Sequence, residues 1–357
     1  MSASTRRGWA SALAGLAAVA LLASCASGAG TTDPAPSDTE PSAPEASESA
    51  EPEASAFPVT VTTTLGDAVI EAKPERVVTL GWGADDIAIS LGTVPVGVEE
   101  DTWAGDADGL RPWFRAAVEE QGAEIPQAIT MYPELDVDAI VALEPDLVLA
   151  PQSGLDQTVF DQLSAFVPVV AYPGAAWGTS IEDQVRTAAK ALGEVEKGEE
   201  LLVERQAALD AVKAEHPEFA DVTFAYIYAG GEAGTMSVYL PGDSRVALLT
   251  GMGLQLDPAV AELGADPGTF TANLGLENAD ILNDVDVLFT WFNDAEEQAA
   301  AESQELFARI PAFEAGAYVP MLDRALGMAV SVATPLSIPW AIDEYLPIIS
   351  EGVAKAS

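Results

Sequence analysis

The chain has 357 residues, with 57 acidic against 15 basic side chains, a formal net charge of −42 and a single cysteine. A field this negative repels nucleic acid and anionic lipid, which argues against binding to either. With one thiol, no intramolecular disulfide can form. Stability must therefore come from core burial, and the chain is long enough for two lobes of ordinary domain size.

The first 25 residues have the pattern of an export signal. Arg6 and Arg7 precede an apolar run of about a dozen residues, which is too short for a membrane span. The tetrad Leu-Ala-Ser-Cys at 22–25 resembles a bacterial lipobox, and that resemblance implies cleavage before Cys25 and a diacylglycerol on its sulfur. A plain secretory signal with a stray cysteine is the alternative, and the two arginines leave twin-arginine export open.

We therefore expect residues 1–24 to be a lipoprotein signal peptide and residues 25–56 to be a lipidated cysteine followed by a disordered tether. The segment 26–56 holds seven acidic side chains, no basic one and no large apolar residue. Such a composition buries too little surface to offset the entropy of ordering. The prediction is a protein tethered to the extracytoplasmic face of the cell membrane.

Short apolar runs alternate with amphipathic segments from Arg76 onward. This alternation predicts an α/β fold with mainly parallel sheets. The expected strands are Arg76–Leu80, Val94–Val98, Asp146–Ala150, Val167–Tyr172, Thr223–Tyr228, Asp286–Trp291 and Ala317–Met321. The expected helices between them include Ala84–Leu91, Val137–Leu143 and Ile181–Leu192. Ligands favour the carboxyl ends of such strands.

One long segment interrupts the alternation. Val195–Glu215 contains no proline, carries charges on one face and apolar residues on another, and is followed by Pro217. This pattern predicts a stiff helix of about 30 Å. We expect an N-terminal α/β lobe at 57–194, a connecting helix at 195–216 and a C-terminal α/β lobe at 217–357. A weak repeat between 135–143 and 274–282, each ahead of an apolar strand, suits two lobes of similar build.

The order of several motifs resembles the solute-binding proteins of iron-siderophore and cobalamin ABC importers, from Phe57 to the end of the chain. These motifs are 75–80 (Glu-Arg-Val-Val-Thr-Leu), Asp85-Asp86, Leu91-Gly92, 95–98 (Pro-Val-Gly-Val) and 143–150 (Leu-Glu-Pro-Asp-Leu-Val-Leu-Ala). Trp113, 176–179 (Ala-Trp-Gly-Thr) and 334–340 (Thr-Pro-Leu-Ser-Ile-Pro-Trp) point to an iron-siderophore branch of actinobacterial type. The resemblance implies two α/β lobes joined by one long helix, with the ligand in the cleft between them.

The residues give no sign of side-chain metal binding or of catalysis. His216 is the sole histidine, whereas sites for bare zinc or manganese need several. The chain has no nucleophile elbow, P-loop or histidine-based acid–base pair, and acids spread over an acidic surface do not identify a glycosidase. We predict a protein that is not an enzyme, has no cofactor, and receives any iron already wrapped in a chelator.

A ferric chelate is bulky, partly apolar and often anionic, so aromatic faces and a few cations would suit it. The candidate ligand-binding residues are Trp82, Trp103, Arg111, Tyr132, Trp177, Tyr239, Arg245 and Trp291. For each aromatic residue, ordinary packing is the alternative. Arg245 is the strongest cation because it is expected in the first turn of a helix, where a positive charge is disfavoured. A salt bridge to a nearby acid is its alternative.

The resemblance also implies a docking function for two carboxylates. In this family a carboxylate near the top of each lobe pairs with arginines of the permease. Glu277 matches the C-lobe position in type, whereas the N-lobe position holds Asp138 where relatives often carry glutamate, which shortens that contact. Helix capping is the alternative for both. The expected partners are a ferric siderophore and the permease and ATPase of an ABC importer, and the protein is expected to be monomeric. Cobalamin or haem is the alternative ligand, and a structural surface lipoprotein is the alternative class.

Overall fold

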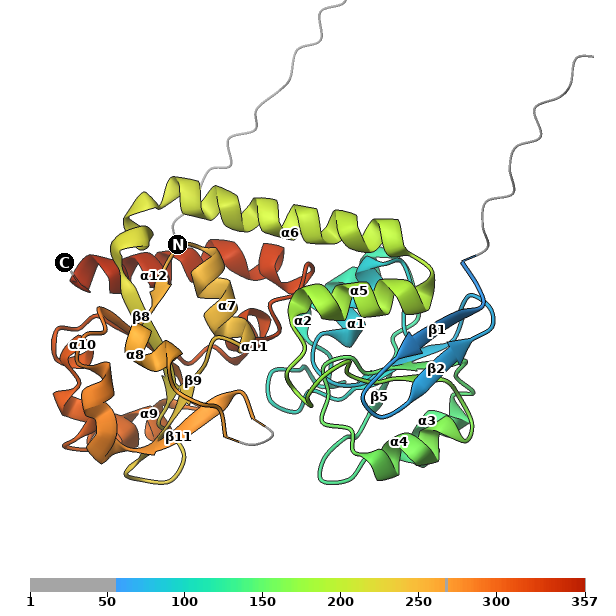
Figure 1. Ribbon diagram of the computed structural model, residues 1–357, viewed down its shortest axis with the longest axis horizontal. Helices are drawn as coiled ribbons and strands as arrows, with labels where there is room; N and C mark the ends of the chain where they lie inside the picture. The colour runs from blue at the N-terminus through green and yellow to red at the C-terminus, as the bar shows by residue number, and fades with distance from the viewer. Residues whose placement is uncertain (1–55, 267–268, 357) are drawn as a thin grey trace, which may run out of the picture. The chain divides into compact units, whose positions relative to one another are not determined.

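The computed structural model describes residues 56–266 and 269–356 (Figure 1). The predictions for Cys25, for the signal peptide 1–24 and for the tether up to residue 55 lie outside the described residues. Within the described part, a two-stranded and a five-stranded sheet come before the long helix α6, Val195–Glu215, and a six-stranded sheet comes after it. We call β1 to α5 the N lobe and the elements after α6 the C lobe.

The N lobe contains an antiparallel hairpin and a five-stranded parallel sheet in the order β5-β4-β3-β6-β7. Its strands are β1 Val59–Thr62, β2 Asp67–Ile70, β3 Val77–Thr79, β4 Gly97–Glu99, β5 Gln127–Ile129, β6 Leu147–Leu149 and β7 Val169–Val170. Its helices are α1 Ala84–Ser90, α2 Pro112–Glu120, α3 Val137–Ala142, α4 Gln157–Ser164 and α5 Ile181–Leu192. The central strands β3 and β6 are buried along their whole length, as expected for parallel strands covered on both faces.

The C lobe is built on a mixed sheet in the order β11-β9-β8-β12-β13, with β10 also paired to β8. Its strands are β8 Thr223–Tyr228, β9 Thr235–Tyr239, β10 Gln255–Leu256, β11 Thr271–Gly275, β12 Val287–Trp291 and β13 Tyr318–Met321. Its α-helices are α7 Ser244–Gly251, α8 Pro258–Ala261, α9 Ala295–Glu302, α10 Pro311–Glu314, α11 Arg324–Val332 and α12 Ser337–Ala356, and its 3-10 helices are η1 Pro217–Asp221, η2 Leu276–Leu282 and η3 Phe307–Arg309. Only β9 runs antiparallel to both of its neighbours.

Helix α6 spans both lobes along one side (Figure 1). Its buried residues recur at helical spacing: Gly198, Leu202, Arg205, Leu209 and Val212. Gly198 allows close packing on α5, because a Cβ added there would lie 2.5 Å from that of Ala189. The helix ends at Glu215, and Pro217 starts the following 3-10 turn. The predicted connecting helix is therefore present.

The predicted fold class is confirmed, with differences in detail. All seven expected strands exist, but β4 is shifted from its predicted range 94–98 to Gly97–Glu99, because Pro95 near the start of that range offers no N–H for the ladder. The repeat is only partial, since 135–143 contains an α-helix whereas 274–282 contains the end of β11 and a 3-10 helix. No helix in the described ranges is long and apolar enough to cross a membrane.

Candidate functional site

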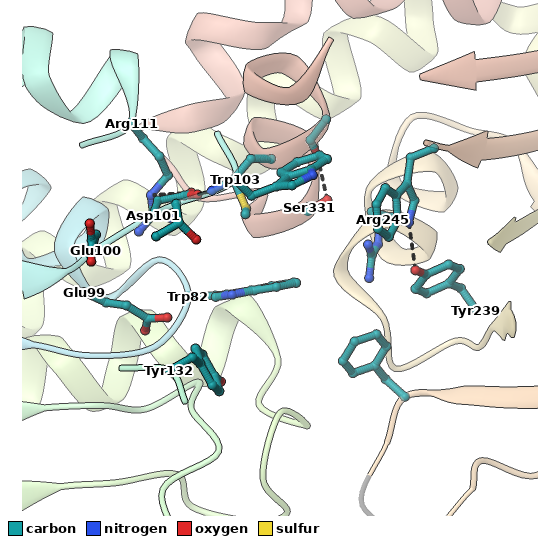
Figure 2. Close-up of a pocket in the computed structure, with 15 residues that line it drawn as sticks. Trp82, Glu99, Glu100, Asp101, Trp103, Arg111, Tyr132, Tyr239, Arg245 and Ser331 are labelled. Atoms are coloured by element: carbon teal, nitrogen blue, oxygen red, sulfur yellow. Dashed lines mark hydrogen bonds and ion pairs between the residues drawn. The ribbon is translucent and has the colours of Figure 1, made fainter. Parts of the chain in front are cut away.

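A pocket of about 370 Å³ is lined by residues of both lobes (Figure 2). Its volume falls within the range of small-molecule sites. Seven of the eight predicted ligand-binding residues line it. The full lining consists of Trp82, Glu99, Glu100, Asp101, Thr102, Trp103, Arg111, Tyr132, Tyr239, Arg245, Phe270, Trp291, Gly327, Met328 and Ser331.

Trp82 is held in the pocket by the tight turn between β3 and α1. Gly81 and Gly83, on either side of it, both have positive φ, and a Cβ on Gly81 would lie 2.2 Å from the carbonyl oxygen of Gln152. The backbone N–H of Trp82 donates to that same oxygen at 2.9 Å. The turn fixes where the indole sits, at the carboxyl end of β3, as sequence reasoning expects for a ligand-contacting residue.

Trp177 is the predicted residue that does not line the pocket. Its ring packs edge-on against Trp82, with 5.6 Å between ring centroids. Its backbone carbonyl accepts a hydrogen bond from the Gln152 side chain at 3.1 Å. Trp177 therefore packs against Trp82 outside the pocket lining. A substitution of Trp177 would affect ligand binding through the position of the Trp82 indole.

Trp103 crosses from the N lobe to the C lobe. Its Nε1 donates to the Asn293 side-chain oxygen at 2.8 Å, and its ring meets Trp291 edge-on at 5.4 Å. Asp101 holds this loop by accepting from the backbone N–H groups of Trp103 and Ala104 at 2.9 and 2.7 Å. This corner of the pocket is thus also a contact between the lobes.

The C-lobe wall is a stack of aromatic rings. Trp291 lies parallel to Tyr228 at 4.2 Å, and its Nε1 donates to the Tyr239 hydroxyl at 2.9 Å, the contact drawn in Figure 2. Phe270, which sequence reasoning missed, stacks with Tyr239 at 6.0 Å. These contacts fix the rings before any ligand arrives, so binding costs little side-chain entropy.

Arg245 lines the pocket and is also fully engaged with its own chain. It lies in the first turn of α7 as predicted, is 4% exposed, and donates to both oxygens of the buried Asp243 at 2.9 and 2.7 Å. Its guanidinium stands 4.0 Å from the centroid of the Tyr239 ring. The salt bridge that the sequence left open as an alternative exists, and it coexists with a place in the pocket wall.

Arg111 has a similar arrangement in the N lobe. Its Nη2 donates to both oxygens of Asp85 at 3.0 Å, and its Nε lies 3.8 Å from Asp101. The side chain is 4% exposed, and its Nη1 is buried with no hydrogen-bond partner among the described residues. A buried donor without an acceptor is costly, so this arrangement carries a local energetic cost.

Three consecutive acids, Glu99, Glu100 and Asp101, form part of the N-lobe lining at the end of β4. Sequence reasoning missed them, although they follow a predicted strand directly. Glu99 accepts from the backbone N–H of Gly81 at 2.6 Å, and its burial raises its pKa to about 7 despite nearby Arg111. The lining is therefore acidic on one side and aromatic throughout.

The raised pKa of Glu99 makes the stability of the fold depend on pH. Its neighbours are the Gly81 N–H, Arg111, Asp85 and Asp101. Between about pH 5 and pH 7 the folded state keeps a proton that the unfolded state has released, so this group lowers stability as pH rises through that interval. The free energy of unfolding of the wild type should therefore fall between pH 5 and pH 8. We expect this fall to be about 2 kcal/mol smaller in Glu99→Gln.

Urea unfolding of the wild type and Glu99→Gln at both pH values measures this difference. The exposed Glu120→Gln is the matched control and should follow the wild type. The free energy of unfolding of Glu99→Gln should still decrease somewhat as pH rises, because burial also raises the pKa of Asp86 to about 7. Equal pH dependence in the wild type and Glu99→Gln would show that Glu99 titrates normally.

Asp86 joins the two lobes behind the pocket. It is fully buried in α1 and accepts from Trp113 Nε1 at 2.8 Å and from the Thr334 hydroxyl of the C lobe, also at 2.8 Å. Trp113 in turn packs against Trp340 of α12, with 5.2 Å between ring centroids. Two of the three segments that carried the narrower family resemblance, Trp113 and 334–340, thus meet at one contact between the lobes.

The two predicted docking carboxylates are exposed and do not cap helices. Asp138 lies in α3, whose N-terminal cap is instead Asp136, accepting from the Ala139 N–H at 2.9 Å. Glu277 lies in the first turn of η2, which has no side-chain cap. Both α3 and β11, the strand that leads into η2, lie on the side of the lobes away from α6 (Figure 1).

No group of three or more His, Cys, Asp or Glu side chains within 56–266 and 269–356 could hold a metal ion. His216 caps the end of α6 and contacts Glu218 at 3.0 Å. What the pocket offers a ligand is therefore aromatic surface, acidic groups and arginine N–H donors, which suits binding of a sizeable molecule without chemical change to it.

Comparison with known proteins gives a consistent set of relatives. The model of the family described as "Periplasmic binding protein" matches residues 77–319. Among curated proteins, the chain is 26% identical over 155 residues to the Fe(3+)-citrate-binding protein YfmC of Bacillus subtilis, covering 43% of this chain and 46% of that protein. The chain spans less than half the length of the curated relatives it matches.

Solved structures match over nearly the whole described body. Streptococcus pneumoniae PiaA in complex with ferrichrome has a TM-score of 0.76 and 29% identity, covering 84% of this chain and 99% of that one. A periplasmic solute-binding protein of Mycobacterium smegmatis has a TM-score of 0.70 and 26% identity, covering 83% and 98%. The two-lobed arrangement is thus shared along the full length of these relatives.

Proposed function

Because the chain belongs to the periplasmic binding protein family, whose members are binding components of transporters and not enzymes, we propose that it captures a ferric siderophore for an ABC importer. The observation that carries this proposal is the pocket between the lobes, with six aromatic residues in its lining. Rigid aromatic faces suit a bulky, partly apolar chelate. The relative solved with ferrichrome supports the same ligand class.

Delivery requires a permease and its ATPase, and we propose Asp138 and Glu277 as the contacts with the permease. Each is an exposed carboxylate, one per lobe, with no capping task in its own helix. One charge on each lobe would let a permease engage both lobes at once. The helix α6 spans the lobes and implies modest closure rather than a wide hinge motion.

The proposed location is the outer face of the cell membrane, with the body held by a lipid on Cys25 and the acidic tether of residues 26–56. This part of the proposal rests on the sequence pattern alone. It is consistent with capture of a scarce ligand outside the cell, because a tether keeps the receptor near its permease. The proposal includes a monomer, an actinobacterial Gram-positive surface, and no further cofactor.

Titration of the intrinsic tryptophan fluorescence tests the ligand class. We expect saturable quenching by ferric siderophores and not by cobalamin or haem, because Trp82, Trp103 and Trp291 line the pocket. Trp82→Leu should weaken siderophore binding about tenfold or more, since it removes an aromatic face that the turn at Gly81 holds in place.

Phe166→Leu is the matched control, because Phe166 is 70% exposed and outside this pocket. Its affinity should equal that of the wild type. Quenching by cobalamin or haem alone would show that this compound, and not a siderophore, is the ligand. Failure of every ligand to give a saturable response would favour a structural surface lipoprotein.

A further inference from the structure

The charges of the pocket bear on which chelate it takes, and this step rests on the proposed function. Both lining cations are already paired within the chain, Arg245 with Asp243 and Arg111 with Asp85. All four side chains of these pairs are at most 5% exposed. Each pair is therefore close to neutral and adds no net positive charge to the cavity.

The remaining charges of the lining are acidic. Glu99, Glu100 and Asp101 stand on the N-lobe side with Arg111 as the lining cation beside them (Figure 2). Glu99, whose pKa burial raises to about 7, carries only part of its charge at neutral pH, so the acidic wall consists mainly of Glu100 and Asp101. Glu100 is half-buried, and among the residues that the structure describes its side chain accepts one hydrogen bond, from the Thr130 hydroxyl at 3.3 Å, and forms no ion pair with a base. An anionic ligand would meet this acidic wall at short range in a site of reduced polarity.

Two further features act in the same direction. The faces of aromatic rings carry negative potential and attract cations rather than anions. The whole chain carries 57 acidic against 15 basic side chains, and a field of that sign lowers the encounter rate of anionic ligands. What the two arginines still offer is hydrogen bonding, from guanidinium N–H groups that their paired carboxylates do not use.

We infer that this pocket selects a ferric chelate of zero or positive net charge whose outer atoms include carbonyl or hydroxamate oxygens. The ferric tris-hydroxamates meet this description, because three singly charged hydroxamates cancel the charge of Fe³⁺. Three doubly charged catecholates leave a strongly negative complex, which the acidic wall disfavours. The arginine donors supply hydrogen bonds to the oxygens, and the aromatic walls cover the apolar backbone of the chelate.

Binding of three ferric chelates to the full chain tests this inference. The probes are ferrichrome as a neutral tris-hydroxamate, a linear tris-hydroxamate with a free ammonium group as a cationic one, and a tris-catecholate as an anionic one. We expect both hydroxamates to bind about a hundredfold or more tighter than the catecholate, and added salt to narrow that gap.

Glu100→Gln isolates the acidic wall. We expect this substitution to raise the dissociation constant of the cationic hydroxamate about fivefold relative to that of the neutral one. The matched control is Glu200→Gln on α6, an exposed position that removes the same charge away from the pocket and should leave the ratio of the two constants unchanged.

Loss of charge selection and loss of siderophore binding would give different results in these measurements. Tightest binding of the catecholate, or an unchanged ratio in Glu100→Gln, would overturn the charge selection and leave siderophore binding standing. If no ferric chelate of any charge binds saturably, the proposed function itself is overturned. Tight hydroxamate binding with a shifted ratio in Glu100→Gln supports both.

Discussion

Asp86→Ala is expected to lower the free energy of unfolding by about 3 kcal/mol. The carboxylate is fully buried and accepts hydrogen bonds from Trp113 of the N lobe and Thr334 of the C lobe. Removing it leaves two buried donors without an acceptor at a contact between the lobes.

The size of this effect depends on two opposing terms. Burial of Asp86 and the nearby Asp85 both disfavour its charged form, which is why its pKa rises to about 7. The substitution relieves that cost. It also leaves the Trp113 and Thr334 donors without their acceptor in a contact that is buried from solvent. Because desolvated donors are costly, we expect the loss of hydrogen bonds to outweigh the relief.

Urea unfolding at pH 7 measures the difference, with Asp67→Ala as an exposed control on β2 that should change little. Asp86→Asn should give an intermediate loss, because an amide keeps one accepting oxygen but presents N–H groups to the Trp113 donor. A loss below about 1 kcal/mol in Asp86→Ala would show that the contact is neutral overall.

The long elements could be predicted from the sequence because their own residues determine them. Helix α6 begins and ends where its pattern predicted, since no proline interrupts it and Pro217 follows. Strand β8 also has its predicted bounds, because its apolar run is long enough to stand out. Strands β5, β9 and β11 were missed, since each mixes polar with apolar residues and no continuous apolar run marks it.

The residues of the candidate site also differ in whether the local sequence or only the packing of the fold places them there. Trp82 and Trp103 could be proposed from their positions after predicted strands, which is where parallel sheets present ligand contacts. Met328 and Ser331 could not, because they reach the pocket only through the packing of α11 against other elements. The pairing of Arg245 with Asp243 was one possibility among many acids, and only the fold selects it.

Glu277→Arg is expected to abolish siderophore uptake while leaving affinity for the ligand within twofold of the wild type. This follows from the proposed docking to an arginine of the permease, where a charge reversal turns attraction into repulsion. Glu277 is exposed in η2 and does not line the pocket, so its substitution should not alter ligand binding.

Transport of iron-labelled siderophore into cells that lack the native copy measures this effect. Glu314→Arg on α10 is the matched control, an equally exposed acid of the C lobe, and should transport normally. Asp138→Arg on the N lobe should reduce uptake less, because the shorter aspartate side chain would make a weaker contact with its partner. Normal uptake with Glu277→Arg would exclude this residue from the permease interface. Lost uptake combined with lost ligand affinity would instead point to an effect on the fold, since the proposed interface and the pocket share no residue.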